Sequence, residues 1–221
     1  YFQIAQSLGL LERPSEKINQ LKEIIELFPR SPILDDCYFE LATTYANSEN
    51  FEKALEYYNF TIKKFPESVF TPKAILNKAL IIYNSGDLIN SENLLKDYVL
   101  KFPTEITVTQ ALLTLKEIAV EKNSVEEFSK WIKSSGVSSI SELEIEKASI
   151  DAIELLLNQK KEKQLKKALE NYIANYPNGL DVKRISYLLG EILYSNNILD
   201  ESIVNFKRVV SGTRNNYSEK S

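Results

Sequence analysis

The fold of this chain is decided by residues 38–66, which read YFELATTYANSENFEKALEYYNFTIKKFP. In and just before this stretch, apolar side chains recur at intervals of three and four residues, first within 34–47 and again within 51–65. This spacing is typical of two amphipathic α-helices, which the polar residues 48–50 separate. Pro66 ends the pair because proline cannot continue the helical hydrogen-bond ladder. The stretch therefore predicts one helical hairpin.

The hairpin recurs along the chain with a period of 37 residues. Aromatic-proline pairs close successive units at Phe28-Pro29, Phe65-Pro66, Phe102-Pro103 and Tyr176-Pro177. These prolines are 37, 37 and 74 residues apart, and 74 is two periods. The pentapeptide YFQIA at 1–5 also returns as YFELA at 38–42. Two independent markers with one period indicate a repeat protein of about six units.

The repeat predicts an all-α fold, a right-handed α-solenoid of about six antiparallel helix hairpins. The expected helix pairs are 1–12 with 14–28, 33–47 with 51–65, 70–84 with 88–102, 105–122 with 124–134, 142–158 with 161–175, and 181–195 with 199–211. Leu95 and Tyr58 are expected to be buried between helices.

Small and large side chains keep a fixed place in each unit. We number the repeats so that the second one begins at residue 35. Position 8 is then small at Ala5, Ala42, Ala79 and Gly190, and position 24 is large at Leu21, Tyr58, Leu95, Ile132, Leu169 and Phe206. Small residues let two helices approach closely, and large ones fill the remaining gap. This pattern resembles the tetratricopeptide repeat. The resemblance is strong in the second and third repeats. It is weaker in the fourth and fifth repeats, where Lys116 and Ile153 occupy position 8.

The length of the repeat indicates which members of the family this chain resembles. A 37-residue period that closes on Phe-Pro or Tyr-Pro is similar to bacterial cell-envelope members of the family, such as BamD-like and Tol-Pal-associated lipoproteins. This resemblance alone implies a location in the bacterial periplasm or cell envelope.

The fourth unit departs most from the pattern and suggests how the chain is divided. We expect repeats 1–3 and the first helix of repeat 4 over 1–122, a short helix with a possible hinge over 123–141, and repeats 5 and 6 over 142–221. The alternative is a merely shortened helix whose Trp131 caps the local core. The absence of methionine predicts that the sequence is a segment of a longer protein.

Composition excludes several kinds of site. The chain has no His and a single Cys, Cys37, so His-based triads and Cys-cluster metal sites cannot form. It has 27 basic and 31 acidic residues, and this acidity argues against a nucleic-acid partner. There is neither a glycine-rich phosphate loop nor an apolar run long enough for a transmembrane segment. We therefore expect no enzyme activity, no metal and no cofactor.

The resemblance places positions 2, 5, 9 and 12 of each first helix on a concave groove. The candidate groove residues are Phe39, Leu76, Leu80, Tyr83, Leu113, Glu117, Glu154, Tyr187, Glu191 and Tyr194. We expect a partly exposed apolar strip with carboxylates along its C-terminal half. The alternative is that the apolar residues at position 5 pack between neighbouring first helices.

These residues predict a non-enzymatic scaffold that binds a peptide or protein segment in a largely apolar groove. The glutamates favour a partner with basic residues, through on-rate and specificity more than through affinity. The alternative is an architectural spacer or self-association module within a larger envelope protein.

Overall fold

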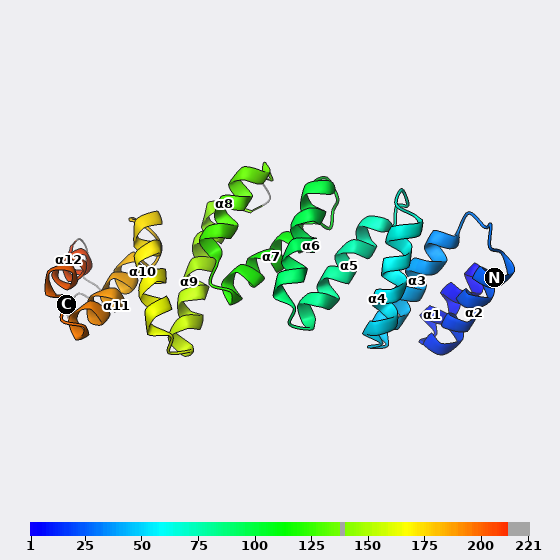
Figure 1. The fold of residues 1–221 in the computed structure, drawn as a ribbon, viewed down its shortest axis with the longest axis horizontal. Helices are drawn as coiled ribbons and strands as arrows, with labels where there is room; N and C mark the ends of the chain where they lie inside the picture. The colour runs from blue at the N-terminus through cyan, green and yellow to red at the C-terminus, as the bar shows by residue number, and fades with distance from the viewer. Residues whose placement is uncertain (138–139, 212–221) are drawn as a thin grey trace. The chain divides into compact units, whose positions relative to one another are not determined.

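The structure is a computed structural model that describes residues 1–137 and 140–211. These residues form twelve α-helices and no β-strand (Figure 1). The helices are α1 (Phe2–Leu10), α2 (Pro14–Leu27), α3 (Leu34–Asn47), α4 (Phe51–Lys64), α5 (Thr71–Asn84), α6 (Leu88–Lys101), α7 (Val108–Glu121), α8 (Val125–Ser135), α9 (Glu142–Asn158), α10 (Glu162–Asn175), α11 (Val182–Ser195) and α12 (Leu199–Val210). Every predicted helix is present with its ends within three residues of expectation, and the all-α solenoid is confirmed.

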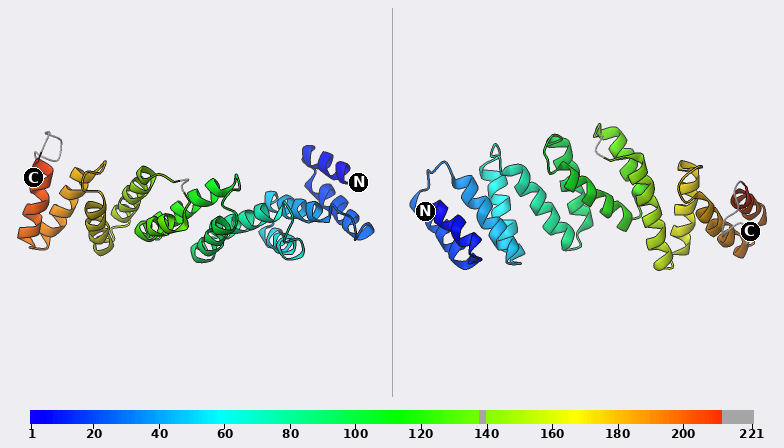
Figure 2. Two further views of the ribbon diagram at one scale, coloured as in Figure 1. Left: turned by 90° about the horizontal axis from the view of Figure 1, so that it is seen from above. Right: turned by 180° about the vertical axis from the view of Figure 1, so that it is seen from behind.

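The turn inside each hairpin has the same backbone geometry in all six repeats. One residue per turn has a positive φ, and these residues are Glu12, Glu49, Gly86, Asn123, Lys160 and Asn197. They are spaced by 37 residues, and only one of them is glycine. A single left-handed residue reverses the chain between two helices, so this conformation fixes how the second helix returns along the first. Consecutive helices can be followed as antiparallel pairs in Figures 1 and 2.

Side-chain caps mark several helix starts. The Asn50 side chain accepts a hydrogen bond from the Lys53 N–H at 3.2 Å, which caps α4. Ser141 and Glu144 form a reciprocal capping box at the start of α9. Such caps satisfy N–H groups that have no partner within the helix. They explain why α4 and α9 begin where the sequence predicts.

The chain divides into two compact units, unit 1 at 1–115 and unit 2 at 116–221, and the boundary lies inside α7. This boundary precedes the predicted division at residue 122. The hinge expected over 123–141 stays a prediction, and two residues of that segment, 138 and 139, lie outside the described residues. The two units are therefore described one at a time.

In unit 1, extensive contacts join helices that are neighbours in sequence, from α1 with α2 through α5 with α6. Ala42 on α3 and Ala54 on α4 are completely buried, so the two helices approach closely at these small residues. Tyr58 and Leu95 are 1% and 0% exposed, which confirms that they lie between helices.

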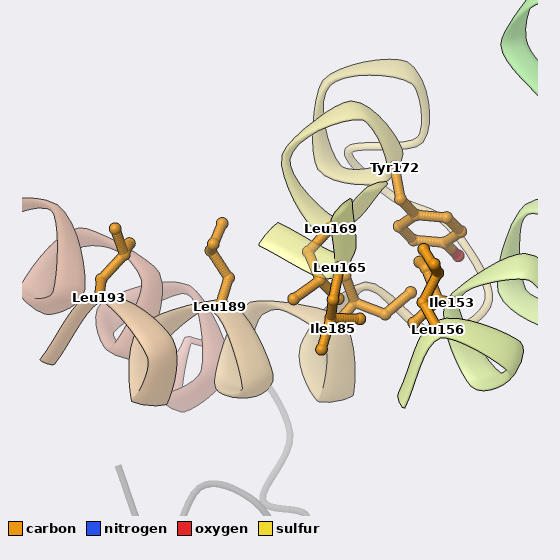
Figure 3. Close-up of a cluster of buried hydrophobic side chains, with 8 residues drawn as sticks. All are labelled: Ile153, Leu156, Leu165, Leu169, Tyr172, Ile185, Leu189 and Leu193. Atoms are coloured by element: carbon orange, nitrogen blue, oxygen red, sulfur yellow. The ribbon is translucent and has the colours of Figure 1, made fainter. Parts of the chain in front are cut away.

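In unit 2, one apolar cluster joins α9, α10 and α11 (Figure 3). Its buried members are Ile153, Leu156, Leu165, Leu169, Tyr172, Ile185, Leu189 and Leu193. Leu165, Leu169 and Tyr172 come from α10 and lie between side chains of the flanking helices. Because α10 contributes to both sides, burial of these side chains holds two successive repeats together.

A hydrogen bond at one repeat position ties the two helices of a hairpin together. In unit 1 the Ser91 hydroxyl on α6 donates to the Ala79 carbonyl on α5 at 2.9 Å. In unit 2 the Ser202 hydroxyl on α12 donates to the Gly190 carbonyl on α11 at 3.1 Å. A Cβ at Gly190 would lie 2.5 Å from the Phe206 ring, so α11 and α12 approach closely there.

The loops between hairpins are fastened to the preceding first helix. Asp35 on α3 accepts a hydrogen bond of 2.6 Å from the Ser68 hydroxyl in the loop before α5. Glu146 stands three periods later, on α9, and accepts hydrogen bonds from the Leu180 N–H at 2.5 Å and the Tyr172 hydroxyl at 2.6 Å. An acidic residue at one repeat position thus positions the next hairpin in both units.

Candidate functional site

The candidate site is the first-helix face, defined by repeat positions 2, 5, 9 and 12 of the odd-numbered helices. In unit 1 it comes from α3, α5 and the first part of α7. Leu80 and Tyr83 on α5 are half-buried, and Leu113 on α7 is 41% exposed. These three side chains are accessible enough to contact a partner.

Two of the predicted groove residues are buried instead. Phe39 and Leu76 are 9% and 1% exposed, so the expectation that they belong to an exposed strip is wrong. The Phe39 ring stacks on Phe70 with centroids 5.2 Å apart and contacts Tyr58 at 6.0 Å. Phe39 and Leu76 at position 5 are therefore core residues, which is the alternative that the sequence left open, whereas Leu113 at the same position is exposed.

A small polar network lies at the junction of α3, α4 and α5. The Tyr58 hydroxyl accepts a hydrogen bond from the Asn77 amide at 3.1 Å and shares another with Thr43 at 3.2 Å. Burial of the ring raises the pKa of Tyr58, so the hydroxyl stays protonated at neutral pH. Thr43 stands at position 9, and its engagement with Tyr58 makes it part of the core packing.

The first turn of α3 carries an acidic cluster that the sequence analysis did not assign to the face. Half-buried Asp36 has a pKa raised to about 6, mainly by burial and then by the nearby carboxylates of Glu40 and Asp35. Lys17 on α2 forms an ion pair with Glu40 and partly opposes this rise. Asp36 stands at position 2 of its repeat, and this position could have assigned it to the first-helix face from the sequence.

In unit 2 the face contains a basic residue that sequence reasoning missed. Arg184 on α11 forms ion pairs of 2.5 Å with both Glu154 on α9 and Asp181. Glu154 is therefore already matched by a positive charge. Arg184 stands at position 2, where a basic residue three positions after an aspartate could have been recognised as an i, i+3 pair.

The remaining predicted residues of α11 lie on one side of the helix. Tyr187, Glu191 and Tyr194 are spaced by four and three residues, so their side chains follow one another along one stripe. Tyr187 is half-buried, Glu191 is exposed and Tyr194 is 64% exposed. Partial burial and the nearby Glu191 carboxylate, which hydrogen-bonds to it, raise the pKa of Tyr187. The structure thus brings two tyrosines and a carboxylate together.

Glu117 belongs to the part of α7 in unit 2 and is exposed. Among the described residues, neither Glu117 nor Glu191 forms an ion pair with a basic side chain, in contrast to Glu154. Of the three predicted carboxylates, Glu117 and Glu191 remain available to a basic partner.

The described residues of this face offer apolar contacts and hydrogen bonds. Within residues 1–137 and 140–211, no three His, Cys, Asp or Glu residues are placed to hold a metal ion. Cys37 is buried, which raises the pKa of its thiol to about 11 and leaves it as the unreactive thiol at neutral pH. None of the helices in the described part of the chain has the length and apolarity that a membrane span requires.

Comparisons with known proteins bear on the fold. Residues 36–68 match the family model described as tetratricopeptide repeat. A tetratricopeptide repeat protein from Parabacteroides merdae is similar in structure, with a TM-score of 0.55 and 11% identity over 96% of this chain and 78% of that one. A chain in the structure of Naa15/Naa10 bound to HypK-THB has a TM-score of 0.59 and 16% identity over 93% of this chain and 30% of that one. Comparison with curated proteins found no match.

Proposed function

Because residues 36–68 are a tetratricopeptide repeat and the helices follow the fold of such proteins, we propose that this chain is a non-enzymatic scaffold. It binds an extended or helical segment of a partner protein along the first-helix face. The tetratricopeptide fold generally mediates protein–protein interaction, and the apolar and acidic residues of this face supply the contacts.

The observation that supports this proposal most directly is the stripe of Tyr187, Glu191 and Tyr194 on α11. A lysine or arginine side chain can place its charge beside Glu191 while its aliphatic stem lies on the tyrosine rings. Tyrosine combines a large apolar ring with a polar hydroxyl, which suits it to an interface. A basic partner segment is therefore the preferred occupant of unit 2.

Existing ion pairs decide which glutamates of the face a basic partner can reach. Glu154 is paired with Arg184 at 2.5 Å, so a partner would have to displace Arg184 to reach it. Glu191 accepts a hydrogen bond from Tyr187 but, among the described residues, has no ion pair that a partner would have to displace. Exposed charges attract one another over only about 8–10 Å at physiological salt, so binding weakens moderately rather than disappears as salt rises.

The proposal is tested with two labelled peptides of equal length, one alternating leucine with lysine and one alternating leucine with glutamate. Fluorescence anisotropy should show tighter binding of the lysine peptide. Tyr194→Ala should weaken that binding several-fold and leave the thermal melt unchanged, because Tyr194 is exposed.

Tyr1→Ala is the matched control, because Tyr1 is 60% exposed and lies outside the candidate site. Equal weakening by Tyr1→Ala and Tyr194→Ala would contradict the proposal. Equal affinity for the lysine and glutamate peptides would remove the preference for a basic partner.

An architectural or self-associating role is the second candidate, and an exposed apolar surface on α12 favours it. Leu199, Ile203 and Val204 are between 47% and 58% exposed. Sedimentation of the chain over a range of concentrations distinguishes the two roles. A dimer that is lost in Ile203→Lys would favour self-association, whereas a monomer at all concentrations favours the scaffold. A periplasmic or envelope location stays a prediction.

A further inference from the structure

Unit 2 contains a cavity of ≈ 350 Å³ between two second helices, α8 and α10, with α9 as its floor. Ser149 and Ala152 on α9 and Ala168 and Asn171 on α10 line it, and Lys130 on α8 lies opposite. A volume of this size lies in the range of binding cavities for small groups. The cavity is distinct from the first-helix face, because α8 and α10 are both second helices.

The repeat itself shows what occupies the corresponding space in unit 1. Tyr38 on α3 and Tyr57 and Phe60 on α4 stand three periods before Ser149, Ala168 and Asn171. The Tyr38 ring stacks on Phe60 with centroids 4.1 Å apart and contacts Tyr57 at 6.2 Å.

Three aromatic rings therefore pack together at these repeat positions in unit 1. In unit 2 a hydroxymethyl group, a methyl group and an amide replace them. Smaller side chains at the same repeat positions leave open the space that the three rings occupy in unit 1.

Hydrogen bonds and an ion pair connect side chains that line the cavity. Glu126 on α8 accepts a hydrogen bond from the Asn171 amide across the cavity at 3.1 Å and pairs with Lys130 at 2.7 Å. Tyr172 beneath them is fixed by its 2.6 Å hydrogen bond to Glu146. Polar groups thus surround a floor that includes Ala152, so a group with an apolar body and a polar edge matches the lining.

We propose that this cavity is a docking site for an aromatic side chain, best a tyrosine, presented by a partner protein. The ring takes the place that Tyr57 and Phe60 fill in unit 1, and the phenolic hydroxyl exchanges hydrogen bonds with the polar lining. This inference goes beyond the proposed function, since it adds a second contact surface that uses none of the residues of the first-helix face.

The experiment uses the isotope-labelled full chain and three probes, the acetylated and amidated pentapeptides Gly-Gly-Xaa-Gly-Gly with tyrosine, phenylalanine or leucine at the centre. Amide chemical shifts are followed as each peptide is added. The tyrosine and phenylalanine peptides should shift the amides of Ser149, Ala168 and Asn171 in a saturable manner, with affinities in the millimolar range. The leucine peptide should shift them several-fold less.

Two variants refill the cavity with the side chains of unit 1, Ala168→Tyr and Asn171→Phe. Each should abolish the shifts. Gln164→Tyr is the matched control, because Gln164 is exposed on α10 outside the cavity, and it should leave them unchanged. A thermal melt verifies that each variant is folded, and either filled variant alone suffices for the test.

Several results would overturn the proposal. They are shifts that persist in the filled variants, equal shifts with the leucine peptide, shifts confined to Tyr187 and Tyr194, or no shifts with any peptide. Failure here leaves the first-helix face untouched, since that face is tested with the Tyr194→Ala variant and longer basic peptides.

Discussion

The Tyr172 hydroxyl on α10 donates a 2.6 Å hydrogen bond to the Glu146 side chain on α9, across 26 residues of sequence. Glu146 also accepts from the Leu180 N–H, and the Tyr172 oxygen accepts from the Asp181 N–H at 3.1 Å. Two side chains therefore fasten two helices and the loop that leads into α11. Only 9% of Glu146 is exposed, and these partners compensate for its burial.

Glu146→Ala should lower the free energy of unfolding by about 2–5 kcal/mol, because it leaves the Tyr172 hydroxyl and the Leu180 N–H without their acceptor in a buried place. Chemical denaturation followed by circular dichroism measures this change. Glu142→Ala, at an exposed site on the same helix, should change stability by less than about 0.5 kcal/mol. Equal effects of the two substitutions would contradict the role of Glu146.

Gly179→Ala should destabilise unit 2 by about 1–3 kcal/mol, since the added Cβ would lie 2.5 Å from the Glu146 side chain and 2.6 Å from the Tyr172 oxygen. Gly9→Ala is the control. There the Cβ meets only the flexible end of Lys17, at 3.2 Å, and alanine favours a helix interior by about 0.5–1 kcal/mol. Denaturation curves should therefore move in opposite directions, and a shift of both in one direction would count against this account.

Leu95→Ala and Tyr58→Ala should each cost about 2–5 kcal/mol, through lost transfer free energy and a residual cavity. Both side chains are at most 1% exposed. Tyr58→Phe separates packing from hydrogen bonding, because it removes only the bonds to Thr43 and Asn77. It should cost about 1 kcal/mol in the same denaturation assay. A loss below about 1 kcal/mol in both alanine variants would show that the repeat register is misplaced.

Asp36→Asn should stabilise unit 1 at neutral pH. The pKa of Asp36 is raised to about 6 in the folded protein, so folding favours its protonated form. Stability therefore falls as pH rises from about 4 to about 6, and the cost remains fully present above that range. After allowance for its partial exposure we expect a gain of about 1 kcal/mol in Asp36→Asn at pH 7 and none at about pH 4. Thermal melts at several pH values measure this, with Asp97→Asn as an exposed control; a pH-independent gain would contradict it.

The sequence predicted the fold well because its signals act locally. The aromatic-proline pairs and the apolar spacing of 37-residue units define helix ends and buried faces without reference to distant parts of the chain. The fastening of the loops by Asp35 and Glu146 was not predicted, because an acidic residue near a helix start is typical of an ordinary solvated face. Hydrogen bonds to loop N–H groups depend on where a loop folds back, and side-chain periodicity carries no such information.

The candidate site was predicted less well than the fold. Position 5 is apolar in every unit, and periodicity alone does not distinguish a groove wall from a helix–helix contact. Phe39 and Leu76 proved to be buried, and the Phe39 ring stacks on Phe70. The sequence also contains a feature that could have predicted the cavity beside α8. Ser149 and Ala168 are small at repeat positions that Tyr38 and Tyr57 occupy in unit 1.

The extensive helix contacts within each unit join sequence neighbours, as from α1 to α6 and from α8 to α12. A pulling force applied to the two ends of a unit therefore passes through its hairpins in series, and each one carries the whole load. The hairpin with the weakest contacts yields first, and only the hairpins next to it lose an interface. Such a unit lengthens stepwise by about one repeat at a time, and this gives it the behaviour of an extensible tether.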